Sequence, residues 1–167
     1  MALTADISTD RYGSPDGHQP QSLALGASVT VYRGSVAAIS GGTSVTKGYG
    51  KNMATPAATD VVIGIVNRAI DIANTSPGIV GTSADGGVHV EVETGTFILA
   101  CGTGADALTV TNNGLPVYLV DEKTVSSVST SRPVAGVQVA DPTTDPTIPS
   151  GFVAVTLGTQ STHGGSP

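Results

Sequence analysis

Short segments in which apolar and polar residues alternate are the feature that most constrains this chain. In the clearest of them, Val88–Glu93, three valines alternate with His89, Glu91 and Glu93. A period of two residues is that of a β-strand with one buried face. The same period recurs in Leu23–Val31 and in Val153–Leu157. The alternation therefore predicts an all-β protein.

Turn-forming residues separate almost all of these segments. The chain of 167 residues contains 22 glycines and 10 prolines, but only three lysines and three glutamates. Because strong helix formers are scarce, a helical bundle or a coiled coil is excluded. A hydrophobic fraction of 39% also argues against a disordered chain. Further strands are expected at Val61–Val66, Thr96–Ala100, Leu108–Val110, Val117–Val120, Thr124–Val128 and Val134–Ala140.

The composition divides the chain into three parts. Residues 1–22 are polar and rich in turn formers, and we interpret them as an N-terminal arm. Residues 23–158 are expected to form the β domain, and residues 159–167 a flexible tail. The first ten residues lack the basic and apolar regions of a signal peptide, so none is expected. No apolar run approaches the roughly 20 residues that span a bilayer.

A faint internal repeat links two parts of the expected domain. Ile63–Ala69 is followed by Gly87–Val92, and Ala135–Ala140 is followed by Gly151–Leu157. Each pair is a strand with a glycine, then a loop, then an alternating strand. Two such units stacked on one core predict a sandwich or a small β-barrel.

Charge restricts the partners that the chain can have. The formal net charge is −6, and no basic cluster is present to neutralise phosphates. Neither nucleic acid nor an anionic membrane is therefore an expected partner. The single cysteine, Cys101, cannot form an internal disulfide, which fits synthesis in a reducing compartment.

Few residues are candidates for chemistry. His89, Glu91 and Glu93 could form a row of metal ligands on one strand face, or simply a solvated polar face. Asp141 and Asp145 could bind calcium weakly, or belong to a connection stiffened by proline. We favour the second interpretation in each case. No nucleophile motif or paired-carboxylate constellation is present, so the chain is expected to be neither an enzyme nor a cofactor- or metal-binding protein.

The order of the expected strands carries a resemblance to a known family. Val61–Val66 is followed by Gly95-Thr-Phe97, by Val117–Asp121 with the letters Val-Tyr-Leu-Val-Asp, and by Ala135-Gly-Val137. This order resembles that of the head decoration, or capsid cement, proteins of tailed bacteriophages. The resemblance covers roughly residues 23–158, and its motifs are turn glycines and core valines rather than reactive groups.

The resemblance implies a β-barrel or β-tulip-like body on the outside of an assembled icosahedral head. There the protein would join neighbouring major capsid subunits as a homotrimer at three-fold and quasi-three-fold positions. It would be made in the host cytoplasm and reside on the outer surface of the virion. The alternative is a glycan- or receptor-binding β module of a phage fibre or adhesin, although carbohydrate sites usually present more aromatic side chains than this chain has.

Two segments are candidates for contact with the capsid or with a neighbouring subunit. The arm offers possible apolar anchors, and the loop of residues 41–58 contains two of the three lysines. The alternative for each segment is a passive, solvated role. The candidate contact residues are Leu3, Ile7, Tyr12, Lys47, Tyr49, Lys51 and Met53.

Overall fold

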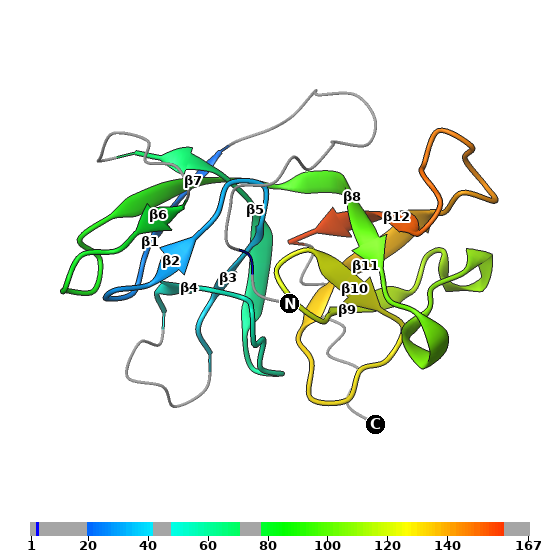
Figure 1. Ribbon diagram of the computed structural model, residues 1–167, viewed down its shortest axis with the longest axis horizontal. Helices are drawn as coiled ribbons and strands as arrows, with labels where there is room; N and C mark the ends of the chain where they lie inside the picture. Colours follow the sequence, from blue (N-terminus) through cyan, green and yellow to red (C-terminus); the bar gives the residue numbers. More distant parts are fainter. Residues whose placement is uncertain (1–2, 4–19, 42–47, 71–77, 159–167) are drawn as a thin grey trace.

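The computed structural model describes Leu3 and residues 20–41, 48–70 and 78–158. These residues are almost entirely strands and turns, and their only helical segments are two short 3-10 turns, Gly104–Asp106 and Val110–Asn112. The predicted all-β class is confirmed. Figure 1 shows two lobes side by side, the first built from β1 to β7 and the second from β8 to β12.

The first lobe is a sheet that curls back on itself. Five of its strands lie in the order β1-β7-β5-β3-β4, and β2 and β6 pair as a separate ribbon. A parallel bridge joins Leu25, just after β1, to Gly50 in β4, so the sheet forms a nearly closed barrel. The strands are β1 (Gln21–Ala24), β2 (Thr30–Val31), β3 (Val36–Ile39), β4 (Gly50–Lys51), β5 (Val61–Ala69), β6 (Ile79–Val80) and β7 (His89–Glu93).

The second lobe is a closed five-stranded barrel in the order β10-β8-β12-β11-β9. Its neighbouring strands are antiparallel except for β10 and β8, which are parallel. The strands are β8 (Gly95–Cys101), β9 (Pro116–Leu119), β10 (Thr124–Ser126), β11 (Val134–Ala140) and β12 (Phe152–Leu157).

The two barrels have the same topology. If the ribbon is set aside, the first barrel uses β1, β3, β4, β5 and β7 in the places where the second uses β8 to β12. In both, the first strand pairs with the fifth, the fifth with the fourth, the fourth with the second, and the second with the third. In both, a parallel contact between the third strand and the first closes the circle.

The match extends to single residues. In the first barrel, Asn67 bulges from the β5–β7 ladder and Ile63 from the β3–β5 ladder. In the second, Val139 and Ala135 bulge at the corresponding places of β11. Bulges are specific features of a ladder, and two pairs in matching places identify equivalent strands. The faint repeat in the sequence is therefore an internal structural repeat.

The apolar core has two main parts. One fills the first barrel and includes Leu25, Val66 and Val90. The other fills the second barrel and extends onto the outer face of β3 and β5, where it includes Val36 and Val62. The amide of Val36 also donates to the carbonyl of Glu122, between β9 and β10, at 2.7 Å. Shared packing and this hydrogen bond join the barrels into one body.

Several expected elements differ from the structure. The single strand predicted over Leu23–Val31 is broken, because Ser28 adopts a left-handed conformation (φ 56°) between β1 and β2. The segment Leu108–Val110 is no strand, since Val110 begins a 3-10 turn closed by Thr109 and Asn112. The first strand already begins at Gln21, within the range assigned to the arm.

Candidate interaction surfaces

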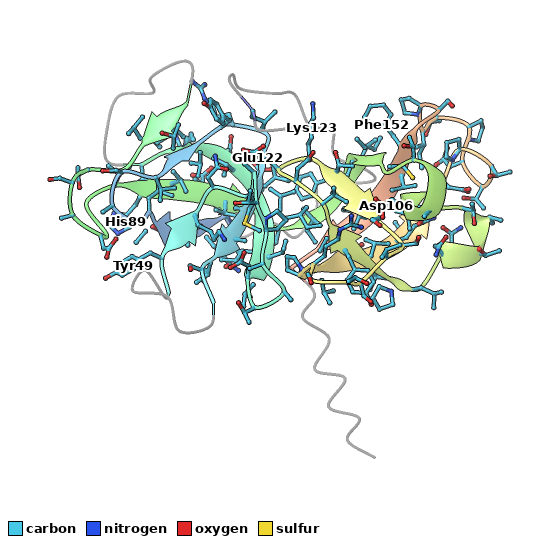
Figure 2. All side chains as sticks on the ribbon, turned by 60° about the horizontal axis from the view of Figure 1, so that its bottom comes forward. Tyr49, His89, Asp106, Glu122, Lys123 and Phe152 are labelled. Atoms are coloured by element: carbon cyan, nitrogen blue, oxygen red, sulfur yellow. The ribbon has the colours of Figure 1, made fainter. Side chains whose placement is uncertain are left out.

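Leu3 is the one described residue of the N-terminal arm that precedes residues 20–22. Its amide donates to Oε2 of Glu122 at 2.9 Å, and Leu3 itself is half-buried. Glu122 is almost fully buried at the junction between the barrels, where Figure 2 labels it. Leu3 is therefore fixed to the connection between β9 and β10. Ile7, Tyr12 and Lys47 lie outside the described residues.

The described part of the loop of residues 41–58 has a structural role. Met53 is fully buried in the core shared by the two barrels, so its side chain is not available for contact in this conformation. Lys51 is paired with the buried carboxylate of Asp60, with Nζ and Oδ2 2.8 Å apart. Tyr49 is half-buried, and its carbonyl accepts a hydrogen bond from Ser40. Two of the candidate contact residues, Lys51 and Met53, thus stabilise the fold.

Asp60 organises this loop, although the sequence analysis did not single it out. Besides pairing with Lys51, its carboxylate accepts hydrogen bonds from the amides of Ala57 at 2.7 Å and Gly41 at 3.3 Å. A buried carboxylate with several such partners fixes the backbone around it. An aspartate directly before a predicted strand was the only sequence signal for this role.

The polar face of β7 is occupied by ion pairs and hydrogen bonds. Asn67 donates to Glu91 at 2.8 Å and to Glu93 at 2.7 Å, and Arg68 pairs with Glu91 at 3.0 Å. The predicted alternation of this strand is confirmed. Because Glu91 and Glu93 accept hydrogen bonds from side chains of β5, they do not form an open row of metal ligands. Among the described residues, no group of three or more potential ligands could hold a metal ion.

A second polar cluster links the first 3-10 turn to the second barrel. Arg132 holds both carboxylate oxygens of Asp106, at 2.6 and 3.2 Å, and Ser126 donates to the same carboxylate at 2.7 Å. The hydrogen bonds from Arg132 and Ser126 hold the pKa of Asp106 below its ordinary value. The cluster ties three segments together and leaves no unpaired nucleophile or base.

Asp141 folds the loop between β11 and β12. Its carboxylate accepts hydrogen bonds from the Thr143 hydroxyl at 2.7 Å and from the Thr144 amide at 3.0 Å. The loop then places Ile148 over Ala154 and Ile98 on the outside of the barrel. These contacts favour a stiff connection over a calcium site at Asp141 and Asp145.

Acid should weaken the fold through Asp141 and Asp121. Burial raises the pKa of each carboxyl group, but hydrogen bonds, among them those from Thr143 and Thr144 to Asp141 and from Lys123 and Thr124 to Asp121, contribute to holding the pKa below its ordinary value. The folded chain therefore binds these protons only at lower pH than the unfolded chain. The stability that these two carboxylates contribute should be fully present above about pH 5 and be lost as the pH falls through their folded pKa values.

Urea unfolding between neutral and acidic pH checks this prediction. Asp141→Asn should reduce the loss of stability on acidification, because the residue no longer titrates. An unchanged pH dependence in this variant would contradict the assignment to Asp141.

Cys101 is half-buried beside the core of the second barrel. Its Sγ lies 3.1 Å from the amide nitrogen of Leu108 and 3.2 Å from the carbonyl oxygen of Gly102. These contacts fit the interpretation of Cys101 as a small packing residue.

The outer face of β9 and β11 is a surface that sequence reasoning missed. Val134 has 38% of its surface exposed, Pro116 is exposed, and Tyr118 and Val137 are half-buried. These residues form two cross-strand pairs, Val134 with Tyr118 and Val137 with Pro116. An outward sheet face is usually polar. This apolar block is therefore a candidate interaction surface, and we call it the β9–β11 face.

No described helix is long and apolar enough to cross a membrane. Comparison with protein-family models, with curated proteins and with solved structures finds no match to this chain.

Proposed function

We propose that this chain is a structural virion protein that binds the outside of an assembled icosahedral phage head. In this role it joins neighbouring major capsid subunits and acts as a trimer at three-fold and quasi-three-fold positions. The observation that carries the proposal is that the carboxylates are used to hold loops, whereas apolar side chains are left on the surface. Asp60, Asp106 and Asp141 hold loops in place, while large apolar side chains remain exposed.

Such a surface suits contact with another protein better than catalysis. Among the described residues, the exposed large hydrophobic side chains are Val61, Ile70, Val80, Val110, Leu115, Val134, Val139 and Phe152. Figure 2 labels Phe152 on the second barrel, on the other lobe from Tyr49 and His89. Exposed apolar residues on a stiff β body are typical of protein contact surfaces. The resemblance to decoration proteins in the order of the strands supports the same role.

The N-terminal arm remains our first candidate for contact with a neighbouring subunit. An extended arm can add a strand to an exposed sheet edge, using backbone groups for affinity. Leu3 is tied to Glu122, which would set the point from which the rest of the arm departs. Several modest contacts of this kind per trimer would add up through avidity.

Co-sedimentation with purified heads of the encoding phage tests the proposal. The full chain should bind heads that lack it, and binding should saturate at a fixed ratio to the major capsid protein. A variant lacking residues 2–20, which stops short of the first residue of β1, should bind much more weakly if the arm carries the contact.

Unchanged binding of this variant would show that the arm is passive. Absence of binding by the full chain, together with specific hits on a glycan array, would favour the glycan-binding alternative instead.

A further inference from the structure

The outer side of β5 shows how this fold treats covered and uncovered positions. Val62 and Ile65 are buried there, at 2% and 5% exposure, and belong to the core that fills the second barrel. Further along the strand, Asn67 is half-buried and Arg68 is exposed, and both bond to carboxylates of β7. The strand is therefore apolar where a protein body covers it and polar where solvent reaches it.

The equivalent strand of the second barrel, β11, differs from β5 in this respect. The matching bulges place three valines of β11 where β5 has its two buried residues and Asn67: Val134, Val137 and Val139. Val134 and Val139 have 38% and 43% of their surface exposed, and Val137 is half-buried. The fold does not require valine at the third place, because Asn67 occupies it in the first barrel. The apolar outer side of β11 therefore indicates a contact that a single chain does not complete.

The β9–β11 face carries no unpaired charge, even at its borders. On the β10 side, Ser126 pairs with Tyr118. The two charged groups that contact Ser126 are Asp106 and Arg132, and they pair with each other at 2.6 Å. On the β12 side, Thr156 is uncharged, and its hydroxyl is bonded to that of the paired threonine of β8 at 2.7 Å.

This neutrality favours a second copy of the chain as the occupant. The formal net charge is −6, so two copies repel each other where their charged surfaces meet. The outer side of β7, with Glu91 and Glu93, is such a surface. Copies of an acidic chain can approach through a neutral apolar face without bringing like charges together.

We propose that the β9–β11 faces of neighbouring copies pack against one another around a symmetry axis, with Val134, Val137 and Val139 of each chain in the contact. Because like faces meet, Val134 of one copy lies near Val134 of the next. A closed assembly of this kind is the usual form of a homo-oligomer. The contact stands without the proposed function, and only the expected number of three chains rests on it.

Light scattering on the full chain, over a series of concentrations, tests the contact. The wild type should assemble to a multiple of the 16.5 kDa chain mass. Val134→Asp brings like charges together in the contact and should weaken association at least about 100-fold. Val139→Asp, in the same row, provides a second variant with the same expected loss. Val80→Asp alters a valine of β6 that is 49% exposed and should assemble like the wild type. Near-UV circular dichroism identifies the variants that are folded.

Mixing variants of opposite charge makes the test specific to like faces. Val134→Lys alone should be defective, as Val134→Asp is, because each copy then meets its own charge. An equimolar mixture of the two should associate at least about tenfold more tightly than either variant alone, because opposite charges then meet across the contact. A mixture no better than its components would overturn the proposal. So would a monomeric wild type, normal assembly of the folded aspartate variants at Val134 and Val139, or loss of assembly in Val80→Asp.

The result is separable from the head-binding assay. A chain that assembles through this contact and does not bind heads refutes the proposed function and supports the contact. A chain that binds heads and is monomeric in solution does the reverse.

Discussion

Replacing Gly64 or Gly136 with alanine should lower the free energy of unfolding by about 2–3 kcal/mol in each case. A Cβ at Gly64 would lie 2.0 Å from the carbonyl oxygen of Glu93, and one at Gly136 would lie 2.0 Å from that of Thr156. Both neighbours are backbone atoms of a paired strand, so neither can move aside without disturbing the ladder. Urea unfolding of the two variants measures the effect.

Gly151→Ala is the matched control. Gly151 has a positive φ of 84°, but no atom would lie within 4 Å of its new Cβ. Its cost should therefore be only that of a left-handed alanine, about 1 kcal/mol. If Gly64→Ala destabilised the chain no more than Gly151→Ala, the close approach of the strands would not be the constraint.

The equivalence of Gly64 and Gly136 shows what the repeat requires. Each glycine lies between the two bulges of its strand, β5 or β11, where the neighbouring strand comes closest. A side chain at either place would separate the fourth strand of the barrel from the fifth. Glycine at both positions is thus a requirement of the shared barrel geometry, and it explains why the faint sequence repeat included a glycine in each copy.

The sequence predicted the strands that have one buried and one polar face. In β7, the valines face the core. The polar side chains lie on the other face of the sheet, where Glu91 and Glu93 contact Asn67 of β5, so the sequence shows a clear alternation. By contrast, β3 reads Val-Ala-Ala-Ile, and its first three residues are buried because the strand packs inside on one barrel and outside against the other. A strand buried on both faces shows no alternation. The sequence analysis therefore missed it.

The candidate contacts were less predictable, because they depend on distant partners. Lys51 resembled a surface charge until the fold brought it to Asp60. The β9–β11 face could not be recognised as open from the sequence, since Pro116 to Leu119 is apolar on both sides of the strand. Only the pairing of β9 with β11, and its comparison with β3 and β5, distinguishes the inward residues from the outward ones.

Met53→Ala should destabilise the chain by about 3 kcal/mol, because the side chain is fully buried in the core that the two barrels share. The alanine would leave a cavity next to residues of both lobes, so their packing should loosen together. The loss is measured as a fall in the midpoint of thermal unfolding, monitored by near-UV circular dichroism and by light scattering.

Met53→Leu separates a packing role from a contact role. Leucine has a similar volume and no polar group, so this change should cost less than about 1.5 kcal/mol and leave head binding unchanged. If Met53→Leu folded normally and lost binding to heads, Met53 would have to leave the core when the protein meets the capsid. If Met53→Leu still binds heads, the result agrees with a role for Met53 in packing the two barrels together.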